Sequence, residues 1–292
     1  MRGPVDGSTR LLGVVGDPIS QVRAPAVWTR LFEHNAINAV CVPMHVPPVA
    51  LRTFFAGIRS LRNLHGLIVT IPHKPVALGL VDHASPRARQ VGAVNVVVVQ
   101  DDGQTRGDIL DGVGFVTALR SRGQQIAGKR ALVVGSGGVG SAIAFALAEA
   151  GARELAVSDI ADSRARGLAA RLQTAGFRAD VSSPDPAGFE LVVNATPLGM
   201  RPDDPLPLDC SRLESSAIVG DVVIHAGLTP VLAAARERGC YVQPGTLMTD
   251  YQIAGMAEFF GFDQGDWSAE AVAHVMADPA PTGPSSPATS AA

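Results

Sequence analysis

The sequence predicts an α/β protein with two domains, each built on a mainly parallel sheet. Its 292 residues are 47% hydrophobic but only 5% aromatic. Ala, Val, Leu and Ile must therefore form most of the core, as in sheets whose strands are buried on both faces. A domain typically holds roughly 100–200 residues, which favours two domains. Short β-branched segments also alternate with amphipathic segments, as in βαβ units.

The first series of elements lies in residues 11–111. The predicted strands are Leu11–Val15, Val40–Pro43, Leu67–Ile71 and Val94–Val99, and the predicted helices are Pro25–Glu33 and Val49–Leu61. Residues 1–10 lack an apolar segment, so we expect a flexible N-terminus and no signal peptide.

A second series begins with a connecting helix at Gly112–Arg122 and fills residues 112–247. Its predicted strands are Leu132–Val134, Leu155–Val157, Ala179–Val181, Leu191–Val193, Ile218–Val223 and Tyr241–Val242. We expect a terminal helix, Met248–Phe260, in a segment (248–276) that need not belong to the nearer domain. Residues 277–292 are rich in Pro, Ser, Thr and Ala, and we expect a disordered tail.

Composition excludes several classes of function. The 24 basic and 27 acidic residues give a net charge of −3, which argues against a nucleic-acid partner and favours a small-molecule ligand. Cys41, Cys210 and Cys240 are far apart and, like the histidines, show no metal-ligand spacing, so we expect no metal, reduced thiols and a cytoplasmic protein. Residues 131–148 are uncharged, but their central glycines argue against a membrane span.

A glycine-rich segment predicts a dinucleotide site. Gly135, Gly137 and Gly140 stand in G-x-G-x-x-G register, with Gly138 and Val139 inside the motif, directly after a buried strand and at the start of an Ala-rich helix. The first glycine permits a tight turn, the second lets backbone N–H groups approach a pyrophosphate, and the third allows close packing of helix on strand. The helix N-terminus favours the negative charge of the pyrophosphate.

Asp159 predicts NAD as the dinucleotide. It follows the next strand and stands 19 residues after Gly140, near the expected ~20. A carboxylate there accepts hydrogen bonds from ribose hydroxyls and repels the additional phosphate of NADP. Arg164 and Arg166 lie nearby and weaken this inference, because a basic side chain can accommodate that phosphate.

Lys74 stands out because the chain uses arginine almost everywhere else. Of 24 basic residues only Lys74 and Lys129 are lysine. A lysine ammonium can exchange a proton when it is partly desolvated, whereas guanidinium stays protonated. Asp111 lies at a predicted loop-to-helix junction, where it could also cap the helix.

Five motifs resemble those of the shikimate dehydrogenase family in order and spacing, over about residues 10–275. They are Val69–Lys74 (VTIPHK), Gly92–Asn95 (GAVN), Asp111–Gly114 (DGVG), Asn194–Met200 (NATPLGM) and Gly245-x-x-Met248-x-x-x-Gln252. The resemblance implies an N-terminal substrate-binding domain, a Rossmann domain, and a C-terminal helix that returns to the first domain across a central cleft.

The resemblance also implies roles for single residues. It pairs Lys74 with Asp111 around the reacting hydroxyl, where one group exchanges the proton while nicotinamide exchanges the hydride. We favour Lys74 as the proton carrier, and the reverse assignment stays open because coupled groups titrate together. The family positions that bind substrate hydroxyls are matched by Thr70, Asn95 and Gln252. The positions near the nicotinamide are matched by Thr196, Pro197, Val222 and Gly245.

The sequence departs from the family where the substrate carboxylate is held. Two serines of the family are replaced by Val22 and Ala24, and its assisting tyrosine by Ile224. Ile68 and Leu110 also replace polar residues. Each lost hydrogen bond to a charged group costs about 1.5–3 kcal/mol. Arg23 and His225 are the candidate replacement anchors.

We therefore predict an NAD-dependent oxidoreductase that acts on a cyclic or compact hydroxy or keto compound other than shikimate, as a monomer or homodimer. One alternative is an ordinary shikimate or quinate dehydrogenase with an unusual carboxylate site. The other is a non-catalytic NAD-binding sensor, against which the retained Lys74 and Asp111 argue.

Overall fold

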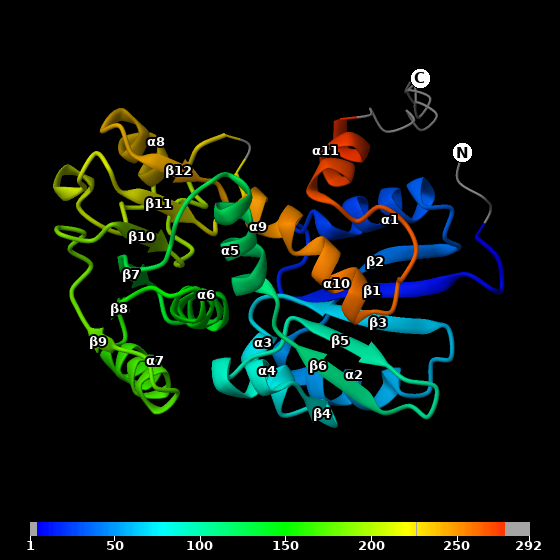
Figure 1. The fold of residues 1–292 in the computed structure, drawn as a ribbon. Helices are drawn as coiled ribbons and strands as arrows, with labels where there is room; N and C mark the ends of the chain where they lie inside the picture. Colours follow the sequence, from blue (N-terminus) through cyan, green and yellow to red (C-terminus); the bar gives the residue numbers. More distant parts are fainter. Residues whose placement is uncertain (1–4, 226, 278–292) are drawn as a thin grey trace, which may run out of the picture.

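The computed structural model describes residues 5–225 and 227–277 and contains two six-stranded sheets. The sheets lie in separate halves of the molecule, with helices α5 (Asp111–Ser121) and α9 (Gly245–Tyr251) between them (Figure 1). The predicted α/β class is confirmed. The predicted tail (277–292) lies outside the described residues except for Ala277, and so do residues 1–4 of the predicted flexible N-terminus.

The first sheet has the strand order β2-β1-β3-β5-β6-β4. Its strands are β1 (Arg10–Gly16), β2 (Ala39–His45), β3 (Leu64–Val69), β4 (His83–Ala84), β5 (Val96–Val99) and β6 (Thr105–Asp108), and its helices are α1 (Ala24–His34), α2 (Leu51–Ile58), α3 (Lys74–Leu78) and α4 (Pro86–Val91). β5 runs antiparallel to β3 and β6, so this sheet is mixed.

Two predictions for the first half are corrected, and two of its strands, β4 and β6, were not predicted. The strand predicted at Leu67–Ile71 begins at Leu64 and ends at Val69, because residues 70–73 form the turn before α3. The helix predicted at Val49–Leu61 is a 3₁₀ turn, Pro48–Ala50, followed by α2. β6 was not predicted, because its sequence TRGD contains no apolar residue and only pairing with β5 makes it a strand.

The second sheet is parallel and has the order β12-β11-β10-β7-β8-β9. Its strands are β7 (Arg130–Val134), β8 (Glu154–Ser158), β9 (Ala179–Val181), β10 (Leu191–Asn194), β11 (Ile218–Asp221) and β12 (Tyr241–Gln243), and its helices are α6 (Gly138–Glu149), α7 (Asp162–Thr174) and α8 (Pro230–Glu237). From β7 the chain adds β8 and β9 on one side, and it then adds β10, β11 and β12 on the other side. The order of strand addition therefore switches between β7 and β10, although all strands are parallel. Ligands of doubly wound sheets bind at the carboxyl ends of the strands at this point.

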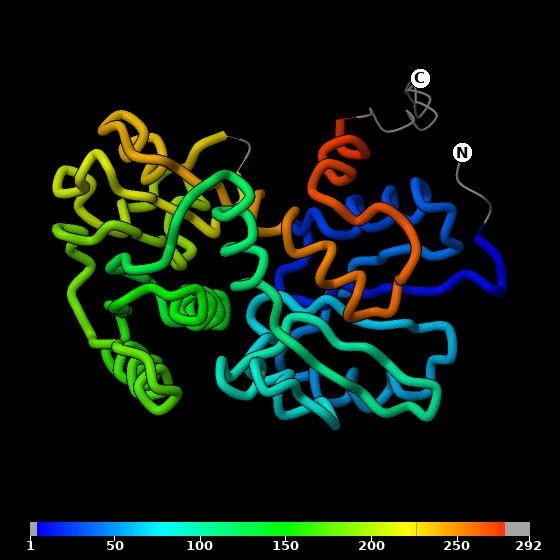
Figure 2. The backbone as a smooth tube through the Cα atoms, in the orientation of Figure 1, coloured from blue at the N-terminus to red at the C-terminus, as the bar shows by residue number. Residues whose placement is uncertain are grey.

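The C-terminal segment differs from the single helix predicted at Met248–Phe260. It forms α9, α10 (Ile253–Phe259) and α11 (Ala269–Ala277), with Gln252 between the first two. The tube in Figure 2 shows this segment passing from the second half of the molecule to the first. There Phe260 and Trp267 pack on Trp28 of α1, with ring centroids 5.9 and 5.4 Å from its own.

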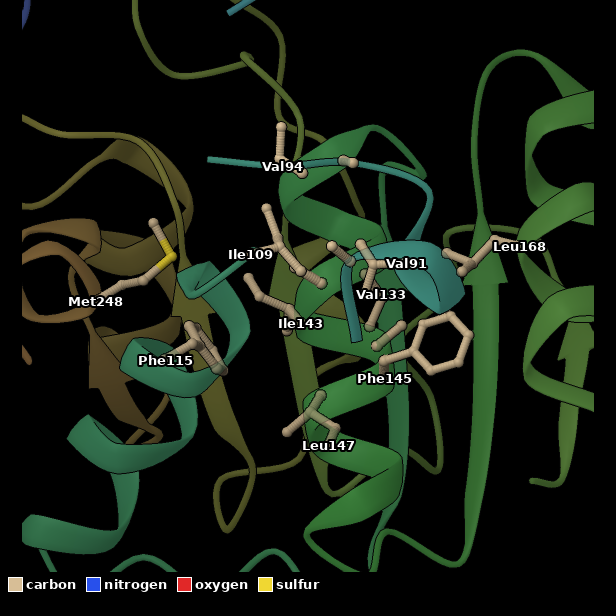
Figure 3. Close-up of a cluster of buried hydrophobic side chains, with 14 of the residues drawn as sticks. Val91, Val94, Ile109, Phe115, Val133, Ile143, Phe145, Leu147, Leu168 and Met248 are labelled. Carbon is tan, nitrogen blue, oxygen red and sulfur yellow. The ribbon is translucent and has the colours of Figure 1, made fainter. Parts of the chain in front are cut away.

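One buried apolar cluster joins the two halves. Figure 3 shows Val91 and Ile109, which belong to the first half, together with Ile143 and Phe145 of α6. Helices α5 and α6 approach so closely that a Cβ at Gly112 of α5 would collide with the backbone of Ala142 of α6. The start of α6 thus lies near Lys74, which follows the carboxyl end of β3 in the first sheet.

Candidate active site

Lys74 and Asp111 form a buried ion pair. The Lys74 Nζ donates to Asp111 Oδ2 at 2.6 Å, and the two residues are only 7% and 3% exposed. Each is the first residue of its helix: α3 follows β3, and α5 follows β6. The ends of two strands in the same sheet thus bring together side chains 37 residues apart.

Asn95 and Gln252 lie beside this pair. The Asn95 side chain accepts a hydrogen bond from the Leu110 backbone N–H at 2.9 Å and donates to Gln252 Oε1 at 3.4 Å. Both residues are buried, and Gln252 stands at the break between α9 and α10. Thr70 is half-buried at the end of β3, and its carbonyl accepts from the His73 N–H at 2.9 Å, in the turn that leads to Lys74. The structure therefore brings three predicted substrate-binding residues close to the ion pair.

The glycine-rich segment occupies the predicted turn between β7 and α6. Gly135 has φ +105°, and a Cβ there would lie 2.7 Å from the Ala195 backbone. A Cβ at Gly140 would collide with the Gly135 carbonyl. Gly137, at the N-cap of α6, faces open space. The N-terminus of this twelve-residue helix is therefore open at Gly137, and a helix N-terminus favours an anion.

The glycine segment also touches the ion pair. A Cβ at Gly138 would lie 3.4 Å from Lys74 Cβ, and the half-buried Val139 follows it in the first turn of α6. The candidate dinucleotide site and the candidate proton carrier are therefore neighbours.

Asp159 lies at the carboxyl end of β8, next to the glycine segment. Its carboxylate accepts hydrogen bonds from the backbone N–H groups of Ser136 at 2.8 Å and Ala161 at 2.9 Å. Ile160 beside it is fully exposed. Arg166 donates to Asp162 at 2.6 Å on the surface of α7.

The loops after β10 and β11 complete the edge of the second sheet. The Asn194 Oδ1 accepts from the N–H and hydroxyl of Thr196 at 3.0 and 2.7 Å, and the next residue, Pro197, is exposed. A Cβ at Gly245 would lie 2.6 Å from the Val222 backbone. The four residues expected near the nicotinamide therefore all follow the carboxyl ends of strands in the second sheet: Thr196 and Pro197 after β10, Val222 after β11 and Gly245 after β12.

Asp221 is a residue that the sequence analysis missed. It is fully buried at the end of β11 and accepts hydrogen bonds from Thr229 Oγ1 at 2.6 Å, the Val223 N–H at 2.9 Å and Asn194 Nδ2 at 3.0 Å. Burial raises the pKa of this carboxyl, and the hydrogen bonds act in the opposite direction. Asp221 thus holds the two loops together. A charged residue inside the apolar run IVGDVV was the available signal.

Comparison with known proteins identifies the family. Residues 14–97 match the model of the shikimate dehydrogenase substrate binding domain. Over 256 residues the chain is 41% identical to shikimate dehydrogenase (NADP(+)) of Rubrobacter xylanophilus. The aligned region covers 85% of this chain and 89% of that protein. The chain belongs to the shikimate dehydrogenase family. It is thus an oxidoreductase that acts on a CH–OH group with a nicotinamide dinucleotide.

Solved structures of the family superpose over nearly the whole chain. Quinate dehydrogenase from Corynebacterium glutamicum in complex with NAD gives a TM-score of 0.82 at 30% identity, covering 92% of this chain and 98% of that one. 5-Ketofructose reductase of Gluconobacter sp. strain CHM43 gives 0.81 at 25% identity, covering 92% and 98%. The curated relatives are named for NADP(+), which favours NADP over the NAD expected from Asp159.

The apolar replacements in this member of the shikimate dehydrogenase family lie on four segments of the chain. Val22 and Ala24 pack on an apolar cluster that contains Ile68 and Leu110, the residue before Asp111. Ile224, after β11, is 43% exposed. An apolar cluster therefore reaches Leu110, directly before the Asp111 of the ion pair.

Neither candidate anchor for a carboxylate stands free. The Arg23 guanidinium lies 3.9 Å from the Asp250 carboxylate, and burial raises the pKa of Asp250 while Arg23 lowers it. The His225 Nδ1 accepts from the Gly227 N–H at 3.2 Å.

Within residues 5–225 and 227–277, no group of three or more His, Cys, Asp or Glu side chains could hold a metal ion. No helix in these ranges is long and apolar enough to cross a membrane.

Proposed function

We propose that the protein interconverts an alcohol and a ketone on a cyclic or compact substrate, with Lys74 as the proton carrier. The buried Lys74–Asp111 pair beside Gly138 carries this proposal, because it places a proton-exchanging group next to the dinucleotide segment. A bound nicotinamide supplies the hydride exchange.

The residues of the chain have separate tasks in this scheme. During reduction, the Lys74 ammonium donates a proton to the oxygen of the substrate carbonyl and becomes neutral; during oxidation, the neutral amine takes the proton back. Asp111 orients the amine and stabilises its positive charge. Asn95, Thr70 and Gln252 bind substrate hydroxyls, and the close packing of α5 on α6 keeps water from the pair.

We propose NAD as the preferred dinucleotide on the position of Asp159. Its carboxylate is fixed by two backbone N–H groups at the end of β8, where an additional ribose phosphate would meet a negative charge. The NADP(+) in the relatives' names supports the opposite choice.

Comparing kcat/KM for NAD and NADP in the wild type and in Asp159→Asn tests this choice. We expect the wild type to prefer NAD and the variant to lose about tenfold of that preference, which corresponds to about 1.4 kcal/mol. Asp101→Asn, at an exposed aspartate in a turn of the first half, is the matched control. A wild type that prefers NADP would refute the assignment.

Two substrate classes remain, each supported by its own observation. The relatives' names support shikimate or quinate. The apolar Val22, Ala24 and Ile224 support a cyclic or compact substrate without a carboxylate, and a structural neighbour is named for 5-ketofructose. We propose the second class on the residues themselves.

Initial rates of nicotinamide reduction decide between these classes. The substrates are shikimate, quinate and a panel of carboxylate-free cyclic alcohols, with Lys74→Ala as the blank. We also expect Val22→Ser combined with Ala24→Ser to raise kcat/KM for shikimate at least about tenfold, because two donors to a carboxylate return. Efficient shikimate turnover by the wild type would refute the second class. Dinucleotide binding with no turnover of any substrate would favour the sensor.

A further inference from the structure

Arg171 is a half-buried cation that the proposed chemistry does not use. It lies on α7, yet its Nη2 donates to Ser141 Oγ of α6 at 3.1 Å and to the Val91 carbonyl at the end of α4 at 3.5 Å. Its Nε is buried and has no hydrogen-bond partner in the described part of the chain. Burial lowers the pKa of this guanidinium. A buried Nε without a hydrogen-bond partner is unfavourable, so packing alone does not explain this side chain.

On one side, Arg171 is connected to the dinucleotide segment. The Ser141 hydroxyl accepts from Arg171 and donates to the Ser136 carbonyl at 3.3 Å. The Ser136 N–H in turn donates to Asp159, and the Ser141 N–H donates to the Gly137 carbonyl at 2.8 Å. Arg171 therefore braces the turn from Ser136 to Ser141, where we expect the pyrophosphate.

On the other side, Arg171 is connected to the segment that carries Asn95. Val91 is the last residue of α4, and the chain turns at Gly92 (φ +81°) into residues 93–95. The Val94 N–H donates to the Lys74 carbonyl at 3.0 Å. Figure 3 shows Val91 inside the buried cluster that joins the two halves. A shift of Val91 would therefore move the segment that contains Asn95 and that donates a hydrogen bond to the Lys74 carbonyl.

We propose that Arg171 is a positioning residue that couples occupancy of the dinucleotide segment to the ordering of residues 91–95. The inference rests on the proposed dinucleotide binding. A ligand that holds the Ser136–Ser141 turn also holds Ser141, and through Arg171 it stabilises the Val91 carbonyl and the segment after it. Linkage makes this coupling reciprocal, so order in residues 91–95 strengthens dinucleotide binding.

Hydrogen–deuterium exchange of residues 91–95, with and without saturating NAD, tests the coupling without any substrate. In the wild type we expect NAD to slow exchange of these amides about fivefold or more. In Arg171→Met this slowing should disappear although NAD still binds, and Arg171→Lys should restore part of it. Ser141→Ala removes the intermediate hydroxyl without touching the charge and should give the same loss. Arg178→Met, at an exposed arginine after α7, is the control and should behave as the wild type.

Calorimetric titration of each variant with NAD and NADP separates the possible failures. Equal NAD-dependent slowing in the wild type and in Arg171→Met would overturn this inference and leave the proposed function intact. A wild type that binds neither dinucleotide would overturn both. Loss of the slowing in the Arg178→Met control would also overturn the inference, because the effect would then not be specific to Arg171.

Discussion

Lys74 and Asp111 place two opposite charges in a nearly water-free position. Desolvating both groups costs several kcal/mol, and their attraction offsets this cost only while both partners are present. A buried ion pair is therefore a weak means of stabilising a fold. Its position beside Gly138, in the expected dinucleotide segment, supports a role in proton exchange instead.

Replacing Lys74 by Met should remove activity while leaving most of the packing. The thioether chain fills the volume of the lysine stem but cannot exchange a proton. We expect kcat to fall about 10²–10⁴-fold, the usual contribution of general acid–base catalysis. Steady-state rates on the best substrate of the panel provide the measurement, with Lys129→Met as the matched control. Retention of more than about a tenth of the wild-type kcat would argue for Asp111 as the proton carrier.

A double-mutant cycle should show that the pair contributes little net stability. Lys74→Met alone leaves the Asp111 carboxylate buried and unpaired, and we expect a loss of about 3–5 kcal/mol in the free energy of unfolding. The double variant with Asp111→Leu should recover most of this loss. Urea unfolding measures both. A double variant less stable than the single one would contradict this account.

At the scale of elements, the turn from β7 into α6 depends on glycines for two different reasons. Gly140 has no room for a Cβ, because the Gly135 carbonyl lies against it, whereas Gly137 has open space around it and an ordinary φ of −69°. Gly140 is therefore required by the packing of the fold, whereas we expect Gly137 to be required by the ligand.

Alanine at Gly137 should therefore affect dinucleotide binding, and alanine at Gly140 should affect stability. Gly137→Ala should change the free energy of unfolding by less than about 0.5 kcal/mol but weaken dinucleotide binding about tenfold, because the new methyl group occupies the space of the pyrophosphate. Gly140→Ala should lower the free energy of unfolding by about 1–3 kcal/mol through overpacking. Thermal unfolding and calorimetric titration separate the two. Unchanged dinucleotide affinity in Gly137→Ala would place the ligand elsewhere.

At the scale of the whole molecule, one ion pair links distant segments of the first half. Asp82, after α3, accepts from Arg59 at 2.5 Å and from the Thr105 N–H and hydroxyl of β6 at 2.8 and 2.9 Å. The hydrogen bond from Arg59 is the main cause that lowers the pKa of Asp82 to about 2. Because its pKa in the folded state is below the ordinary 3.8, this carboxylate stabilises the fold above pH 3.8.

That contribution should be lost as the pH falls from 3.8 to about 2. Asp82→Asn should lower the free energy of unfolding at neutral pH by about 1 kcal/mol, since the pair is one-third exposed and partly screened. The difference from the wild type should shrink across this pH range. Urea unfolding at several pH values, with the exposed Asp203→Asn as control, provides the measurement. A difference that persists unchanged at pH 2 would exclude the linkage.

Local patterns predicted those features that depend on neighbouring residues in the chain. The strand, glycine turn and helix from Arg130 to Glu149 were readable because buried strands, glycine turns and Ala-rich helices each have a composition of their own. The parallel strands of the second sheet were found within about two residues. β6 and α11 were missed, because one has no apolar residue and the other packs its apolar face on α1, more than 200 residues earlier.

The α/β class and the family could be predicted from the amino-acid sequence alone, which also nominates residues for proton exchange and dinucleotide binding. These properties depend on residue type and on spacing along the chain. Three contacts became visible only in the folded chain: Lys74 with Asp111 at 2.6 Å, Gln252 with Asn95 at the break in the terminal helix, and Arg171 with Val91. Each of these contacts joins segments that are 37 to 157 residues apart, and no local pattern encodes where such segments meet.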